Sequence, residues 1–147
     1  MFELKEEFLK YSPYGRLLAL DMGTKRIGVA VCDELRKIAI PSDTIYRKGN
    51  KIDIPIILEM IRSKNIKGII IGLPISFDEK ETNSSIFVRR FVENLLKLTN
   101  VPIFLQDERL SSFEAEDLML DSVGYNKTKI VVDKISASYI LESFLNN

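Results

Sequence analysis

The amino-acid sequence predicts an α/β fold with a five-stranded mixed sheet flanked by helices. Three short apolar segments follow one another within residues 16–46. After residue 50, segments with apolar residues at helical spacing alternate with short segments typical of buried strands. The expected order is three strands, a helix, a strand, a helix, a strand and two helices. A three-stranded meander followed by such units forms a mixed sheet covered by helices.

Residues 1–15 are predicted to be an N-terminal extension, and residues 16–147 a single domain. In the extension, apolar residues lie among Lys and Glu and then stop at the turn-forming sequence of residues 12–15 (SPYG). This pattern indicates a short amphipathic helix that ends before the domain begins.

The first three strands are expected to form an antiparallel meander. Residues 16–21 (RLLALD) and 26–32 (RIGVAVC) are apolar runs joined by a short glycine-containing turn, which is typical of a hairpin. Residues 37–46 form the third predicted strand, and Pro41 interrupts it. Because proline has no N–H to donate to a sheet, this strand is expected at an edge or to carry a bulge.

The rest of the chain is predicted from the spacing of apolar residues. Ile54, Ile57 and Ile61 lie on one face of a helix that leads to a buried strand. Serine and glutamate in capping-box register open a later helix at Ser111. The predicted segments are a strand at 68–72, a loop at 76–85, a helix at 86–98, a strand at 101–106, a helix at 111–120, a loop at 121–129 and a helix at 134–145.

Composition excludes several classes of function. The chain has 147 residues, one cysteine and no histidine, with 21 basic and 21 acidic residues. The absence of histidine excludes Ser-His-Asp and Cys-His catalysis and histidine-ligated zinc. The net charge of zero means that a nucleic acid would have to be held by a local cluster of bases.

The sequence also bears on location. No stretch of about 20 apolar residues that could cross a membrane is present. A single cysteine, Cys32, excludes an intrachain disulfide framework and fits a reducing compartment. A cytoplasmic protein with no membrane partner is expected.

Three carboxylates at predicted element ends are the candidate chemical centre. Asp21 closes the first strand, Glu108 follows the fifth, and Asp133 lies at the expected start of the last helix. Strand ends in α/β sheets converge on the crevice where ligands bind. Such carboxylates repel one another unless a hard cation such as Mg²⁺ holds them together, and two metal ions would then support phosphodiester hydrolysis.

Each of the three acids also has a purely structural explanation that needs no metal. Asp21 is about as well explained as a turn former. Glu108 alone would be a solvated acid paired with Arg109, and Asp133 alone an N-cap of the last helix. Their joint placement is therefore the stronger indication.

Basic residues near these acids are candidate nucleic-acid contacts. Lys25 and Arg26 follow Asp21, in a turn where Gly23 either supports a phosphate contact or only permits a positive φ. Arg89 and Arg90 lie in the second long helix, where a solvated charged face is the alternative. Arg109 would neutralise phosphate or orient the neighbouring glutamate.

Four segments together resemble one family, the YqgF/RuvX family of Holliday-junction resolvases, whose bacterial members are also described as pre-16S rRNA maturation nucleases. The matching segments are LLALDMGTKRIGVAVCDE (17–34), IIIGLPISFDEKE (69–81), VPIFLQDERLSSFEAEDLML (101–120) and VDKISASYILESFL (132–145). The resemblance runs from about residue 16 to the end, and residues 1–15 lie outside it.

The resemblance implies a ribonuclease H-like fold and two-metal phosphodiester hydrolysis with Mg²⁺ or Mn²⁺. The implied catalytic and metal-binding set is Asp21, Glu108 and Asp133. Adjacent strand residues face opposite sides of a sheet, so either Asp107 or Glu108 points at the metal, and sequence leaves this choice open. We favour Glu108. The expected function is nuclease action on precursor 16S rRNA, with resolution of branched DNA as the alternative.

Two other functions are weighed against the nuclease. The segment Asp21-Met22-Gly23-Thr24 is similar to the first phosphate loop of actin-like ATPases, but those proteins enclose ATP between two such domains. A non-catalytic RNA-binding scaffold, acting on a ribosomal particle, would need its acids only as caps. The sequence leaves open whether the protein is a monomer or a homodimer, since branched DNA favours a dimer and an RNA end does not.

Overall fold

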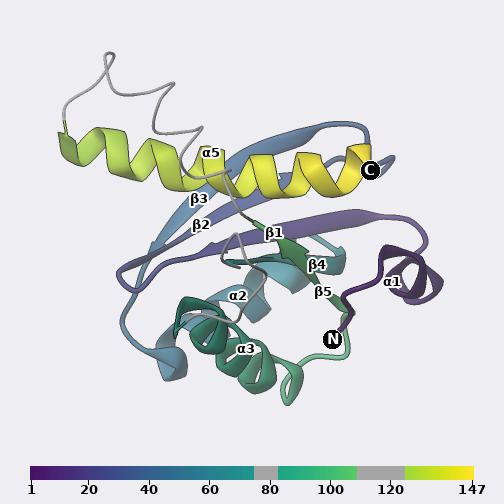
Figure 1. The fold of residues 1–147 in the computed structure, drawn as a ribbon, viewed down its shortest axis with the longest axis horizontal. Coiled ribbons are helices and arrows are strands. Elements are labelled where there is room, and N and C mark those ends of the chain that lie inside the picture. The colour runs from purple at the N-terminus through teal and green to yellow at the C-terminus, as the bar shows by residue number, and fades with distance from the viewer. Residues whose placement is uncertain (75–82, 109–124) are drawn as a thin grey trace.

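The computed structural model describes residues 1–74, 83–108 and 125–147, and for residues 125–132 only the backbone (Figure 1). Its elements are α1 (Lys5–Tyr11), β1 (Arg16–Met22), β2 (Arg26–Cys32), β3 (Ala39–Tyr46), α2 (Asn50–Ser63), β4 (Ile66–Leu73), α3 (Asn83–Leu96), β5 (Ile103–Asp107) and α5 (Tyr125–Asn146). The predicted α/β fold is confirmed, and each predicted strand is present within two residues of its expected ends.

The five strands form one mixed sheet in the order β3-β2-β1-β4-β5. The first three strands pair antiparallel, as the predicted meander requires, whereas β4 lies parallel to both β1 and β5. Pro41 lies in the edge strand β3, where the register shifts between Val29 and Ala30 of β2. Both expectations for Pro41, an edge position and a bulge, are therefore met.

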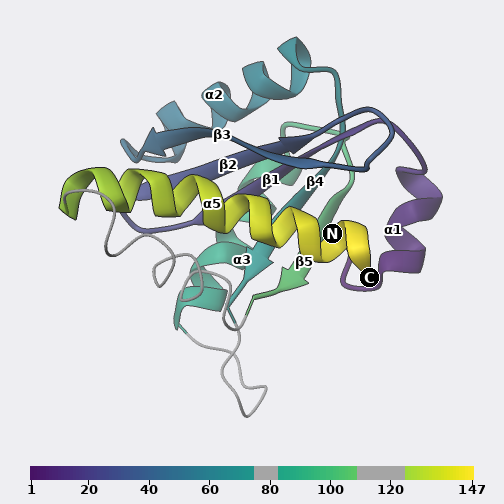
Figure 2. The ribbon, with the colours of Figure 1, turned by 90° about the horizontal axis from the view of Figure 1, so that it is seen from above.

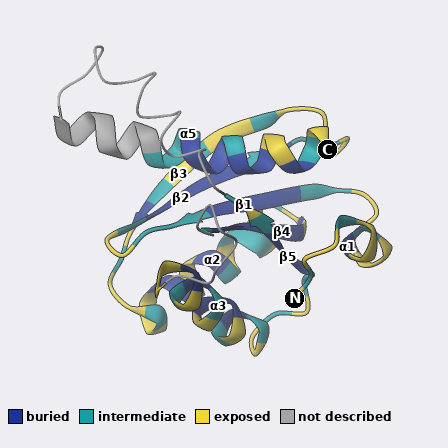
Figure 3. Cartoon of the chain, in the orientation of Figure 1, coloured by how far each residue is buried: buried dark blue, intermediate teal, exposed yellow. Residues whose placement is uncertain are grey.

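Both faces of the sheet are buried (Figures 1 and 3). Helices α2 and α3 cover one face, which contains Leu18, Leu20 and their neighbours, and this face is called the lower face below. Helix α5 covers the other face, the upper face, which contains Leu17 and Ala19. Alternate residues of each strand face opposite sides, so parity along a strand assigns each side chain to a face. Figure 2 shows α5 crossing the strands.

The N-terminal extension packs into the upper face. Phe8 of α1 is fully buried, and its ring lies 5.7 Å from that of Phe104 and 5.4 Å from that of Phe144. Phe2 forms a β-bridge with Phe104. The predicted helix is confirmed, and this segment contributes aromatic side chains to the core. The domain boundary after residue 15 stays a prediction.

The C-terminal helix differs from the prediction. It begins at Tyr125 rather than near residue 134, so the predicted loop at 121–129 is wrong from residue 125 onward. Helix α3 likewise begins at Asn83, inside the predicted loop at 76–85. The predicted helix at 111–120 lies outside the described residues. Within the described ranges, every helix is too short or too polar to span a bilayer.

Candidate active site

Asp21 lies on the upper face, near the end of β1. Its neighbours Leu20 and Met22 pack against the lower-face core, so parity turns the Asp21 side chain toward α5. Asp21 is partly exposed, in contrast to the fully buried Leu20. The end of β1 therefore presents a carboxylate beneath the last helix.

Two glycines flank Asp21 on the neighbouring strands. Gly28 of β2 is its cross-strand partner, and Gly72 of β4 follows Ile71, the partner of Leu20. At these two positions, neighbouring strands therefore place no side chain on the upper face. Glycine inside a strand is typical where another group approaches the backbone closely.

A different part of the chain approaches each glycine. A β-carbon on Gly28 would overlap the backbone carbonyl of Asp133 in α5. A β-carbon on Gly72 would overlap the Glu108 carboxylate at Oε2. The two glycines thus bring Glu108 and Asp133 to the two sides of Asp21.

The structure separates Asp107 from Glu108. Asp107 pairs with Leu73, which packs in the lower-face core, and parity places the Asp107 side chain on that side. Glu108 lies over Gly72 on the upper face, and its backbone N–H donates to the Leu73 carbonyl at 3.1 Å. Of the two adjacent acids, only Glu108 shares a face with Asp21.

Asp133 reaches the site from inside a helix. The expectation that it starts or caps the last helix is wrong, because α5 begins eight residues earlier, at Tyr125. The Asp133 carboxylate accepts a hydrogen bond from Arg26 Nε at 2.6 Å, and both side chains are only about a quarter exposed. This ion pair joins β2 to α5 beside Asp21.

The three acids lie on the upper side of the sheet without forming a finished metal site. In the part of the chain that the structure describes, no three acidic or cysteine side chains lie close enough together to hold an ion. Their chemistry nevertheless fits Mg²⁺ or Mn²⁺, which prefer carboxylate oxygens. A carboxylate oxygen of Glu108 occupies the position above Gly72 where any other residue would place its β-carbon. This placement of an oxygen ligand supports the fit.

The turn after Asp21 carries two of the predicted bases. Lys25 is exposed, whereas Arg26 is paired with Asp133. Gly23 does not adopt a positive φ, so that explanation for it is wrong. A β-carbon at Gly23 would lie 2.6 Å from the carbonyl oxygen of Arg26, which accepts a hydrogen bond from the Gly23 N–H at 2.9 Å. The glycine is needed for a tight turn.

The other predicted bases lie elsewhere. Arg89 and Arg90 belong to α3, which covers the lower face, and Arg89 pairs with Glu3 at 2.6 Å. The structure does not bring these two arginines to the Asp21 carboxylate. Arg109 lies outside the described residues.

Arg47, which was not among the predicted site residues, stabilises the turn after Asp21. Its Nε donates to Asp53 Oδ2 at 2.7 Å, and its Nη1 donates to the Gly23 carbonyl at 3.3 Å. Its guanidinium lies over the rings of Phe87 and Phe91 of α3, 5.3 and 5.6 Å from their centroids. Arg47 thus ties the turn after Asp21 to both lower helices. No spacing pattern points to a single arginine of this kind.

Comparisons with known proteins identify the family of the chain. Residues 15–147 match the family model RuvX, described as Holliday junction resolvase. A protein of Ruegeria pomeroyi, named "Putative pre-16S rRNA nuclease", is 39% identical over 98% of this chain and 95% of its own length. A protein of the same name from Rhodobacter capsulatus is 41% identical over 90% of this chain and 84% of its own length.

A solved structure supports the fold. The chain resembles RuvC of T. thermophilus in complex with a Holliday junction substrate, with a TM-score of 0.57 and 10% identity over 88% of this chain and 93% of that one. At this identity the likeness concerns the fold alone, which is ribonuclease H-like. On the strength of the family model and of relatives that align over nearly the whole chain, this protein belongs to the RuvX family of nucleases.

Proposed function

We propose that the protein is a divalent-metal-dependent phosphodiester hydrolase that matures the 5′ end of precursor 16S rRNA. The observation that carries the proposal is the arrangement of Asp21, Glu108 and Asp133 around two glycines on the upper face. Carboxylate oxygens are the ligands that Mg²⁺ and Mn²⁺ prefer. This match of ligand chemistry is the physical reason to assign the three acids a metal.

Asp21, Glu108 and Asp133 are the residues that would hold Mg²⁺ or Mn²⁺. When bound, the metal supplies an activated water and stabilises the charge that develops on the phosphate and the leaving oxygen. Gly28 and Gly72 have no side chains, which lets Asp133 and Glu108 approach the sheet on either side of Asp21. Arg26 holds the Asp133 carboxylate at 2.6 Å and fixes its direction.

Substrate binding is assigned first to the turn after β1. Lys25 is exposed there, next to Asp21 in the chain, and its ammonium would contact a substrate phosphate. Arg26 would add positive charge at the same place. Arg89 and Arg90 would contact only a longer substrate that reaches α3, and the role of Arg109 stays a prediction. The balanced net charge agrees with local rather than global attraction.

The names of the relatives favour precursor rRNA as the substrate. The family description favours a second candidate, a four-way DNA junction. A junction-cleaving enzyme would be expected to act as a homodimer with two active sites, whereas a monomer could process an RNA end. The RNA proposal also implies contact with a ribosomal particle in the cytoplasm.

The test is a cleavage assay with Mg²⁺ or Mn²⁺ on precursor 16S rRNA ends and on four-way DNA junctions, with Asp21→Asn as control. The proposal predicts metal-dependent cleavage of the RNA end by the wild type and at least about a 100-fold loss in the variant. Cleavage of the junction alone would support the second candidate. Binding of RNA without any cleavage would identify a scaffold, and binding of magnesium-ATP without cleavage an ATPase-like domain.

A further inference from the structure

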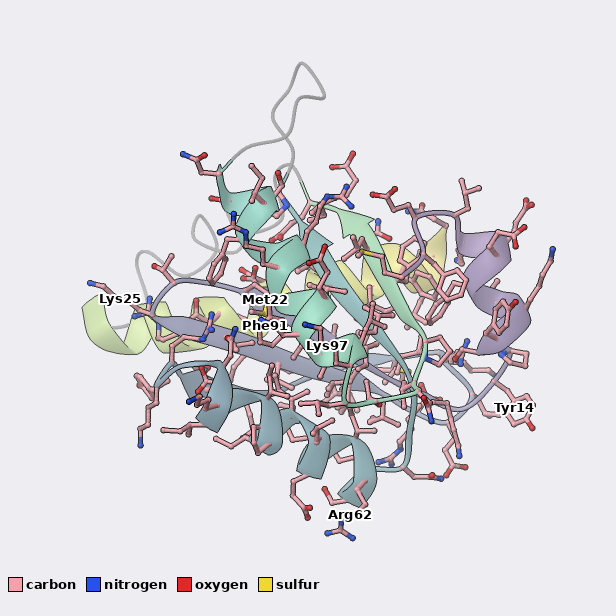
Figure 4. The ribbon with its side chains drawn as sticks, turned by 90° about the horizontal axis from the view of Figure 1, so that it is seen from below. Tyr14, Met22, Lys25, Arg62, Phe91 and Lys97 are labelled. Carbon is pink, nitrogen blue, oxygen red and sulfur yellow. The ribbon has the colours of Figure 1, made fainter. Side chains whose placement is uncertain are left out.

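A second surface feature lies at the other end of the sheet from Asp21. Tyr11, Ser12, Pro13, Tyr14 and Lys67 line a small pocket of about 200 Å³, which is called the tyrosine pocket below. Tyr11 is 68% exposed and Tyr14 is 75% exposed. Figure 4 places Tyr14 beside α1 and Lys25 at the opposite end of the molecule.

The turn that carries the tyrosines is firmly held. Ser12 is 1% exposed, and its hydroxyl donates to the Lys67 carbonyl at 2.9 Å. Arg36 Nη1 donates to the Ser12 carbonyl and Arg36 Nε to the Gly15 carbonyl, each at 2.7 Å. The guanidinium of Arg36 thus fixes both ends of the turn, and Tyr14 lies exposed on it.

Tyr11 is supported from behind. Its ring lies 5.3 Å from the ring of Phe2 at an interplanar angle of 33°, so one side of the tyrosine rests on a phenylalanine anchored to β5. Aromatic side chains held in this way lose little conformational entropy when a flat ligand stacks on them.

The charge of the tyrosine pocket favours an anionic ligand. Lys67 lines the pocket and is exposed, and its side chain lies over Gly15. Arg36 adds a second positive charge behind the turn. Among the residues that the structure describes, none that lines the pocket is acidic. Exposed aromatic rings beside a lysine match a nucleotide, whose base stacks and whose phosphate pairs with the ammonium.

We propose that the tyrosine pocket binds unpaired nucleotides of a single-stranded RNA, with bases stacked on Tyr11 and Tyr14 and a phosphate paired with Lys67. The inference rests on the proposed function for its substrate. Strand β4 runs from Lys67 at the pocket to Gly72 beside Asp21, a span of about 17 Å. A strand held at both places would be cut at a fixed distance from the tyrosine pocket.

The test measures binding separately from cleavage. A labelled single-stranded RNA of about 12 nucleotides, within the site sizes of single-strand binding proteins, is titrated with the full chain in EDTA, and fluorescence anisotropy gives the affinity. Tyr11→Ala and Tyr14→Ala are each expected to weaken binding by about 5- to 100-fold. Lys67→Met keeps the apolar part of the side chain and removes its charge. We expect it to reduce the slope of log affinity against log salt concentration by about one.

Matched variants separate stacking from folding. Tyr11→Phe and Tyr14→Phe keep the rings and are expected to bind RNA as the wild type does. Because the chain contains no tryptophan, quenching of its tyrosine fluorescence by RNA gives an independent readout, which both alanine variants should reduce. Thermal unfolding of each variant verifies that the fold is intact.

The outcomes separate this proposal from the proposed function. Unchanged RNA affinity in both alanine variants would overturn the proposal that the tyrosine pocket binds RNA, whether or not the protein cleaves RNA. Equal weakening by the phenylalanine variants would also overturn it, because stacking would then not explain the loss. Binding that depends on the tyrosines in a protein without nuclease activity would support the pocket and contradict the nuclease proposal.

Discussion

The backbone carbonyl of Asp133 fills the space that a β-carbon on Gly28 would need. Helix α5 therefore touches β2 directly, one strand away from Asp21. The same helix packs on β1, β2 and β3 through small and apolar side chains such as Ala137. This close approach sets how far the Asp133 carboxylate stands from Asp21.

Gly28→Ala should push the helix away from the sheet. The new methyl group meets backbone, which cannot rotate aside, and we expect a loss of about 1–3 kcal/mol in the free energy of unfolding. Urea denaturation followed by circular dichroism measures this loss. A variant with wild-type stability would show that α5 does not pack on Gly28 as described.

Gly72→Ala is the matched comparison. There the new methyl group meets the ends of two side chains, Glu108 Oε2 and, at 2.7 Å, Ile140 Cδ1. Because side-chain ends can move, we expect Gly72→Ala to lose less stability than Gly28→Ala. We also expect it to lose more metal-dependent cleavage than Gly28→Ala, because the new methyl group displaces Glu108. Wild-type kcat in Gly72→Ala would argue against a catalytic position for Glu108.

These two glycines also show what the sequence did and did not predict. The spacing of apolar residues predicted the strands and their order along the chain, whereas parity alone left the choice between Asp107 and Glu108 open. The glycines inside these two strands, Gly28 in β2 and Gly72 in β4, were signals of close approach that the prediction did not use. The approach of α5 to Gly28 depends on packing between residues far apart in the chain, which spacing alone does not reveal.

The start of α5 was mispredicted for a local reason. Residues 121–129 carry Gly124 and several polar side chains, and these are typical of a loop. The structure continues the helix back to Tyr125. Because the helix begins eight residues before it, Asp133 lies inside a helix rather than at its cap.

The buried ion pair of Arg47 and Asp53 should be important for stability. Asp53 is fully buried, and its carboxylate also accepts a hydrogen bond from the backbone N–H of Lys48 at 3.1 Å. Asp53→Asn would leave the guanidinium of Arg47 without its charge partner, and we expect a loss of about 3–5 kcal/mol in the free energy of unfolding.

A surface pair provides the control for this prediction. Glu59 and Arg62 form an ion pair on α2 in which both side chains are mostly exposed. Glu59→Gln should therefore leave the urea midpoint unchanged. Similar losses in Asp53→Asn and Glu59→Gln would contradict the assigned importance of burial.

Cys32 should make stability depend on pH in the alkaline range. The thiol is 1% exposed, and its sulfur accepts a hydrogen bond from the Leu17 N–H at 3.1 Å. Burial raises the pKa of the Cys32 thiol above its ordinary value. As the pH rises, the folded state keeps the Cys32 thiol proton after the unfolded chain has lost it. The contribution of Cys32 to the free energy of unfolding is therefore complete below pH about 8.5 and is lost as the pH rises through the folded pKa.

The measurement compares the wild type with Cys32→Ala. The free energy of unfolding, determined at several pH values from neutral to about 10, should fall more steeply in the wild type than in the variant. Identical slopes would show that the thiol does not contribute. Slow alkylation of the wild-type thiol by iodoacetamide under native conditions would provide independent support for its burial.

The central claim is that Asp21, Glu108 and Asp133 form a metal site on the upper face, and direct Mn²⁺ binding tests it. Electron paramagnetic resonance of free Mn²⁺ during a titration gives the affinity of the wild type, of Glu108→Gln and of Asp107→Asn. We expect the wild type and Asp107→Asn to bind equally, and Glu108→Gln to bind about 10-fold more weakly or worse. Equal binding by all three proteins, or a loss in Asp107→Asn as large as in Glu108→Gln, would contradict the assignment.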